Sequence, residues 1–216
     1  IPGRGIHKAL HKMQDAMWNR PGDCKYCLKL DARHYYQSIN HDVLREKYAK
    51  MFNDSELLWL LNEIIDSVET AEIEDLTAIY LLEEDIDPET GIPIGNYLSQ
   101  YSGNYYFSSF DHWLKEQKHV KDNYRYMDDI TIFGKTKEEL FKLKEDIDIY
   151  FSEELKLTIK ANWQVFPTFI RGVDFLGYRT FYKYTLVRKS TCMTMKEKLT
   201  AIRLKVESGN TMNYSE

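Results

Sequence analysis

The sequence predicts an α+β fold in which an antiparallel sheet carries helices on one face. Segments with apolar residues at helical spacing alternate with short segments rich in β-prone residues. Two of these short segments contain acidic residues, at Asp31 and at Asp128-Asp129. Strands that lie in one sheet can bring such carboxylates together, so the pattern also predicts a site at the sheet.

The first third of the chain predicts three helices and one strand. A helix over 6–18 has apolar residues at helical spacing and ends before Pro21-Gly22, and a short buried strand then leads to Asp31. Two further helices are expected up to about residues 52 and 65. Their candidate N-caps are Asn40 for the first, and Asp54 or Ser55 for the second.

The middle of the chain predicts one long helix over 97–117. It carries an aromatic stripe, for which a core role is favoured over a surface for base stacking: Tyr101, Tyr105, Phe110 and Trp113. A helix over 137–155 follows, with charge pairs at i and i+4. Two or three strands are expected over 157–186, and a polar helix over 193–208.

The stretch Tyr126-Met127-Asp128-Asp129 lies between tyrosines and a β-prone run. Successive side chains on a strand point to opposite faces, so two adjacent Asp residues fit best at the tight turn of a hairpin. A metal site would offset their repulsion, because Mg²⁺ prefers carboxylate oxygens. An acidic turn at the surface is the alternative interpretation.

Three further segments, taken with this stretch, resemble the reverse transcriptases. Asp31 with Tyr36, Ser38 and Ile39 resembles their first catalytic motif, residues 91–100 occupy the place of the second, and Tyr126–Asp129 resembles the third. Residues 171–178 resemble their primer-grip hairpin. The resemblance runs from about residue 3 to about residue 190 and implies a right-hand polymerase palm with partial fingers and the root of a thumb.

The second motif narrows the resemblance. Group II intron and retron enzymes usually have Gln after the motif's Pro and end in Ser-Pro, whereas this chain has Ile94 and Ser99-Gln100. This form is similar to the reverse transcriptases of diversity-generating retroelements, as are the opening residues 3–9. The rival hypotheses are an enzyme of a retron, group II intron or phage-defence system, and a non-catalytic RNA-binding palm.

The resemblance assigns residues to the polymerase reaction. Asp31 and Asp128 would bridge two Mg²⁺ ions, for which Mn²⁺ can substitute, with Asp129 as an outer ligand and the carbonyl of Ala32 as an additional one. Lys160 is the candidate general acid for the leaving pyrophosphate. The remaining assignments are nucleotide binding by Arg33, Tyr36, Ile94, Gly95 and Gln100, and a primer grip made of Phe175, Leu176, Gly177 and Tyr178.

Three of these assignments have alternatives or consequences of their own. Tyr36 would exclude the 2′-hydroxyl of a ribonucleotide, or else serve as a core aromatic residue of the palm. Lys160 is the candidate general acid in one register of the resemblance, whereas other family members have this Lys a few residues later, where this chain has Asn162-Trp163-Gln164 and no lysine. Ile94 cannot form the hydrogen bonds of the usual Gln, which predicts low fidelity, unless it only packs beneath a helix.

The resemblance implies four kinds of partner: an RNA template, a DNA or RNA primer, dNTPs and a basic accessory protein. No apolar run is long enough to cross a membrane, so no membrane partner and a cytoplasmic location are expected. Cys24-Lys25-Tyr26-Cys27 has Cys-x-x-Cys spacing, but packed thiols are favoured over zinc binding or redox function. For His34, His41 and His112, ordinary packed or exposed roles are favoured.

Charge and length raise two expectations. The net charge is −5, and the ten acids between Asp66 and Glu89, a stretch without Lys or Arg, shift the remainder to +5. This stretch is an outward-facing fingers segment or mobile loop, or simply a solvated face. The chain is expected to be a fragment, with partial fingers at 1–24 and 46–92, palm at 25–45 and 93–182, and the start of a thumb at 183–216.

Overall fold

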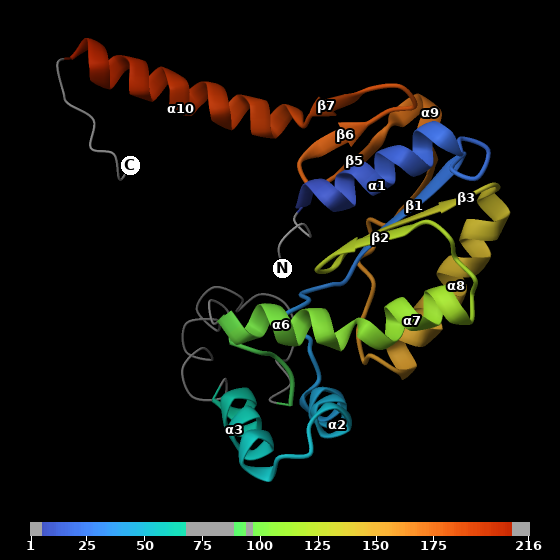
Figure 1. Cartoon of the computed structure of the whole chain (residues 1–216), viewed down its shortest axis with the longest axis vertical. Coiled ribbons are helices and arrows are strands. Elements are labelled where there is room, and N and C mark those ends of the chain that lie inside the picture. Colours follow the sequence, from blue (N-terminus) through green and yellow to red (C-terminus); the bar gives the residue numbers. More distant parts are fainter. Residues whose placement is uncertain (1–5, 68–88, 94–96, 209–216) are drawn as a thin grey trace. The chain divides into compact units, whose positions relative to one another are not determined.

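The computed structural model describes residues 6–67, 89–93 and 97–208, which form two compact units (Figure 1). One unit comprises Tyr26–Phe166, and the other comprises Ile1–Lys25 together with Pro167–Glu216. The predicted α+β class, with an antiparallel sheet and helices on one face, is confirmed.

The first unit is built on a four-stranded sheet in the order β2-β3-β1-β4. Strand β3 is antiparallel to both of its neighbours. The strands are β1 (Tyr26–Asp31), β2 (Asn123–Tyr126), β3 (Asp129–Gly134) and β4 (Gln164–Pro167).

The helices of this unit surround a core of aliphatic and aromatic side chains on one face of the sheet. Leu28, Leu30, Ile130 and Ile132 point from β1 and β3 into this core, as alternation along each strand requires. The helices are α2 (His41–Met51), α3 (Ser55–Asp66), α6 (Tyr97–Tyr106), α7 (Ser108–Glu116) and α8 (Lys137–Glu153).

The predicted N-caps of α2 and α3 are confirmed. The side chain of Asn40 accepts a hydrogen bond from the backbone N–H of Val43, and the side chain of Asp54 accepts bonds from Glu56 and Leu57.

The prediction of one long helix over 97–117 is wrong. The helix is interrupted at Phe107, whose ring is fully buried against Tyr35, Phe110 and Phe151. The helix is thus broken at the residue whose ring is buried in the core.

The aromatic stripe is core for three of its four members. Phe110 is fully buried, and Tyr105 and Trp113 pack against the core. The expectation fails for Tyr101, whose residue is 59% exposed.

The second unit contains α1 (Ile6–Asn19), a three-stranded sheet in the order β5-β6-β7, and two later helices. Its other elements are α9 (Thr168–Arg171), β5 (Val173–Phe175), β6 (Tyr178–Thr180), β7 (Thr185–Val187) and α10 (Lys189–Glu207). Over 157–186 the chain thus has four short strands, β4 to β7, and a helical turn rather than two or three strands. The turn ends at Gly172, which has a φ of 70°.

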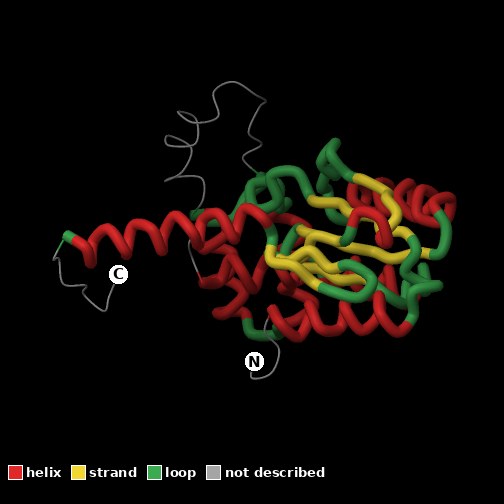
Figure 2. The backbone as a smooth tube through the Cα atoms, turned by 90° about the horizontal axis from the view of Figure 1, so that it is seen from above, coloured by secondary structure: helices red, strands yellow, loops and turns green. Residues whose placement is uncertain are grey.

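Helix α10 is longer than the polar helix predicted over 193–208, because it begins at Lys189. It is one uninterrupted helix (Figure 2), and none of its residues is buried. No helix among the residues that the structure describes is long and apolar enough to cross a membrane.

Cys24 and Cys27 are both buried. Of the acidic stretch, residues 68–88 lie outside the described residues.

The contact between α8 and the end of β3 leads to a prediction. A Cβ atom added to Gly134 would lie 2.8 Å from Cγ of the buried Leu140. We expect Gly134→Ala to lower the free energy of unfolding by about 1–3 kcal/mol, because an overpacked core must shift to make room. Urea denaturation measures this, with Gly22→Ala as the control, since no atom lies within 4 Å of a Cβ there. Equal effects of the two substitutions would contradict the packing argument.

Candidate active site

The Asp pair lies at the hairpin that joins β2 to β3. Tyr126 pairs with Asp129, so Met127 and Asp128 form the turn between them. Met127 has a φ of 55°, in the left-handed region that tight turns require and that L-residues other than Gly seldom adopt. Asp128 is therefore at the tip of the turn, and Asp129 is the first residue of β3.

Strand β1 brings the third carboxylate to this turn. Asp31 pairs directly with Asp129 in the antiparallel register, and the side chain of Asp31 lies against that of Asp128. Burial, reinforced by the neighbouring Asp31 carboxyl, raises the pKa of Asp128 to about 6. The Oδ1 atom of Asp31 is buried and has no hydrogen-bond partner among the described residues.

Two lysines lie beside the carboxylates. Lys160 Nζ donates to Asp31 Oδ2 at 2.7 Å. Lys29 forms an ion pair with Asp129 and also donates to Thr131 Oγ1 at 3.1 Å. The Asp129 carboxylate is thereby held by Lys29, whereas Asp31 and Asp128 face each other.

The sequence alone did not single out Lys29. Its position two residues before Asp31, on the same face of β1, was the signal that could have found it.

Over the described residues, no group of three or more His, Cys, Asp or Glu side chains is arranged to hold a metal ion. The oxygen donors that the structure brings together are those of Asp31 and Asp128. The role of Asp129 as an outer ligand stays a prediction.

Ala32 and Lys160 belong to a short bridge between two segments. Ala32 pairs with Ile159, Lys160 N–H donates to the carbonyl of Asp31 at 2.9 Å, and Arg33 N–H donates to the carbonyl of Thr158 at 2.8 Å. The bonds of this bridge leave out the Ala32 carbonyl, the candidate ligand.

In the alternative register, the lysine of the family would stand at residues 162–164, where this chain has no lysine. Trp163 packs edge-to-face on Phe141 of α8 and lies under Lys144. Lys160 lies beside Asp31, and its role as the general acid stays a prediction.

Tyr36 reaches the catalytic turn from the segment after β1. Its hydroxyl donates to Met127 Sδ at 3.5 Å, and burial together with the charge of Asp128 raises its pKa. Its ring also packs against the core and lies close to α6, because a Cβ added to Gly103 would be 3.2 Å from Tyr36 Cε1. Both the nucleotide role and the core role are compatible with this position.

The start of the second motif is bonded to the segment that carries Tyr36. Ile92 N–H donates to the carbonyl of Tyr36 at 3.0 Å, and Gly91 N–H donates to that of Ile39 at 2.8 Å. The buried ring of His41 lies 2.7 Å, Nε2 to O, from the carbonyl of Gly91. These bonds connect the first and second motifs.

Ile94 and Gly95 lie outside the described residues, and Gln100 is exposed on α6.

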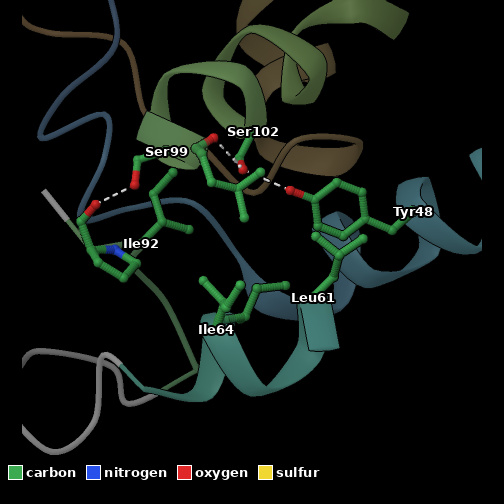
Figure 3. Close-up of a pocket in the computed structure, with 9 residues that line it drawn as sticks. Tyr48, Leu61, Ile64, Ile92, Ser99 and Ser102 are labelled. Carbon is green, nitrogen blue, oxygen red and sulfur yellow. Dashed lines mark hydrogen bonds between the residues drawn. The ribbon is translucent and has the colours of Figure 1, made fainter. Parts of the chain in front are cut away.

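A small pocket lies beside this motif, between α2, α3 and α6 (Figure 3). It is lined mainly by apolar side chains, among them Leu61, Ile64 and Ile92. The Ser99 hydroxyl donates to the Pro93 carbonyl, and Tyr48 and Ser102 share a hydrogen bond of 2.6 Å. Asp31, Asp128 and Asp129 do not line the pocket. We therefore interpret the side chains around it as packing that holds the second motif in place.

The predicted primer-grip residues form a hairpin in the second compact unit. Phe175 ends β5, Tyr178 begins β6, and Leu176 and Gly177 form the turn with φ angles of 54° and 83°. The hairpin is present, and its contact with a primer stays a prediction.

Comparisons with known proteins show the family of the chain and its fold. The family described as reverse transcriptase (RNA-dependent DNA polymerase) matches residues 1–180, so the chain belongs to this family. No curated protein matches the chain in sequence.

Among solved structures, telomerase of Candida tropicalis, truncated from its C-terminal domain, has a TM-score of 0.59 at 14% identity. The match covers 84% of this chain and 39% of that one. Telomerase of Candida albicans, solved with a fragment of telomeric RNA, has a TM-score of 0.55 at 14% identity, over 85% of this chain and 33% of that one. The chain thus spans well under half the length of these proteins, and the likeness concerns the fold.

The raised pKa of Asp128 predicts how stability depends on pH. A carboxyl group that holds its proton more tightly in the folded than in the unfolded state makes the fold less stable as pH rises from about 4 through 6. We expect Asp128→Asn to remove this loss. In EDTA, the variant should melt a few degrees above the parent at pH 8, with a smaller difference at pH 4.5.

The control is Asp42→Asn, at an exposed ion pair on α2. It should change the melting temperature equally at the two pH values. If the gain from Asp128→Asn is also the same at both, the cost of ionising Asp128 in its buried position beside Asp31 is not its cause.

Proposed function

We propose that the protein is an RNA-directed DNA polymerase that adds dNTPs to the 3′-hydroxyl of a DNA or RNA primer on an RNA template. The observation that carries this proposal is the pair of facing carboxyl groups, Asp31 and Asp128, in a chain that belongs to the reverse transcriptase family. In this reading the palm comprises residues 25–45 and 93–182, with partial fingers at 1–24 and 46–92 and a thumb that starts at 183.

The carboxyl pair fits divalent cations. Asp31 Oδ1 is buried without a hydrogen-bond partner among the described residues, and the pKa of Asp128 is raised. A bound cation would therefore stabilise the ionised form of both carboxyl groups. Their oxygen atoms suit Mg²⁺, or Mn²⁺ in its place. Asp129 would support the site from an outer position, and the Ala32 carbonyl would add a main-chain ligand. Two such ions, when bound, neutralise charge on the attacking and leaving oxygens.

The side chains of the protein then have separate tasks. Asp31 and Asp128 would fix the place of the reacting phosphate through the cations that they hold, which is the positioning that phosphoryl transfer requires. Lys160 Nζ lies at the edge of this pair and carries a proton for the leaving pyrophosphate oxygen. Arg33, next to Ala32, and Gln100 on α6 are proposed to contact the nucleotide.

The test of this function is polymerisation by the protein at its natural length. We expect Asp31→Asn and Asp128→Asn each to lower Mg²⁺-dependent dNTP incorporation at least about 10³-fold, because each removes a charge that faces the cations. Primer extension on a defined RNA template measures this, and circular dichroism establishes that the variants fold. The control is Asp146→Asn, whose side chain pairs with Lys118 instead. Unchanged incorporation by either site variant would rule out the two-metal assignment.

We propose that Tyr36 excludes the 2′-hydroxyl of ribonucleotides. Its partly buried ring stands between Gly103 of α6 and the turn that carries Asp128, which leaves little room beside the site. Tyr36→Val should raise the rNTP to dNTP ratio of kcat/KM at least about tenfold, a difference of ~1.4 kcal/mol between the two transition states. A ratio within about twofold of the parent would place the selectivity elsewhere.

We further propose that the enzyme serves a bacterial diversity-generating retroelement. Support comes from the form of the second motif, in which Ile94 replaces the usual Gln and Ser99-Gln100 replaces Ser-Pro. The alternatives are a retron, group II intron or phage-defence enzyme and a non-catalytic RNA-binding palm. Paired template and variable repeats beside the gene would support the retroelement, whereas a co-purifying structured RNA of another kind would favour the first alternative. Primer extension tests the second alternative, because a non-catalytic RNA-binding palm would incorporate no dNTP.

A further inference from the structure

Arg125, on β2, is one of the most completely paired side chains near the catalytic turn. Its Nε and Nη2 atoms donate to the two carboxylate oxygens of Asp111 on α7, at 2.9 and 2.6 Å. Only 11% of the Arg125 side chain is exposed. A two-pronged ion pair of this kind fixes the plane of the guanidinium group, which a single contact would not do.

The third nitrogen of Arg125 is directed at the turn itself. Nη1 donates to the main-chain carbonyl of Met127 at 3.0 Å and to Asn104 Oδ1 of α6 at 3.3 Å. The guanidinium carbon lies 5.0 Å from the centre of the Phe107 ring, at the break between α6 and α7. One side chain therefore connects both helices to the peptide group that precedes Asp128.

This connection acts on a peptide group whose conformation is unfavourable. Met127 is left-handed, with a φ of 55°, and this region is unfavourable for a residue that has a side chain. A hydrogen bond to its carbonyl from a charged, buried donor offsets this cost more than a bond from a neutral donor would. If the peptide group between Met127 and Asp128 rotated, the carboxyl of Asp128 would turn away from Asp31.

We propose that Arg125 is a positioning residue, which holds the Met127 carbonyl so that Asp128 faces Asp31. The inference rests on the proposed polymerase function and adds a residue to its machinery. Asp111, Asn104 and the Phe107 ring orient Arg125 and do not touch the reacting groups. A lysine cannot replace it, because one ammonium group cannot span Asp111 and the Met127 carbonyl with the same fixed geometry.

The experiment compares Arg125→Lys and Asp111→Asn with the parent, in the protein at its natural length. The matched control is Arg45→Lys, because Arg45 also bridges two acids, Asp42 and Asp66, but at the surface of α2. Three quantities are measured: kcat and KM for dNTP incorporation, the dissociation constant for Mn²⁺ from the electron paramagnetic resonance of the free ion, and the melting temperature.

We expect both site variants to lower kcat at least tenfold, with the KM for dNTP within twofold of the parent. Their affinity for Mn²⁺ should fall at least threefold, because the two carboxyl groups no longer face each other. Arg45→Lys should leave kcat, KM and Mn²⁺ affinity within twofold. Merely structural roles for Arg125 and Asp111 would lower the melting temperature without this split between kcat and KM.

Folded Arg125→Lys protein with kcat and Mn²⁺ affinity within twofold of the parent would overturn the proposal. If Arg125→Lys does not fold, Asp111→Asn, which retains the guanidinium group, decides by the same criteria. If the parent protein incorporates no dNTP, the proposed function fails. The Mn²⁺ affinities then still decide whether Arg125 orients Asp128.

Discussion

The antiparallel register of β1, β3 and β2 forces negative charges together. It pairs Asp31 with Asp129 and places Asp128 on the turn beside them. Lys160 pairs with Asp31 and Lys29 with Asp129, while burial, reinforced by the Asp31 carboxyl, raises the pKa of Asp128 to about 6. The protein thus trades stability for a cluster of charge, which is common at active sites and unusual elsewhere.

The helical layer beneath the sheet supports this arrangement from a distance. Phe107 is fully buried and stacks on Tyr35, whose hydroxyl donates to the Gly103 carbonyl of α6. The same ring lies under the guanidinium group of Arg125. Because an aromatic core is closely packed and resists deformation, contacts with it can hold a turn more firmly than contacts with a loop would.

Local patterns in the sequence were enough to predict much of the fold. Features that depend only on residues close together in the sequence were predicted correctly. They are the caps at Asn40 and Asp54, the helix before Pro21 and the hairpin around Asp128. The break at Phe107 depends on how its ring fits against Tyr35 and Phe151, which are distant in sequence. The strand count after residue 157 was wrong because strands of three or four residues leave almost no periodic signal.

The candidate site divides in the same way. Asp31 and Asp128 could be identified because each lies in a short contiguous motif. Their proximity follows from the pairing of β1 with β3. The ion pair that turns Asp129 toward Lys29, and the contacts of Arg125 with Asp111 and Asn104, join side chains from different elements. The Arg125 contacts depend on how the helices pack against the sheet, which no spacing rule within a single segment predicts. The Lys29–Asp129 pair depends on the pairing of β1 with β3, for which the spacing between Lys29 and Asp31 was the available signal.

Gly103 has a consequence for how this protein can change over evolutionary time. The space where its side chain would be is occupied by the rings of Tyr35 and Tyr36, at 3.3 and 3.2 Å. A methyl group there would press on Tyr36 from the side opposite the catalytic turn. Under the role proposed for Tyr36, a substitution at this helix position would change the selection between ribose and deoxyribose as well as the packing of the buried Tyr35 ring.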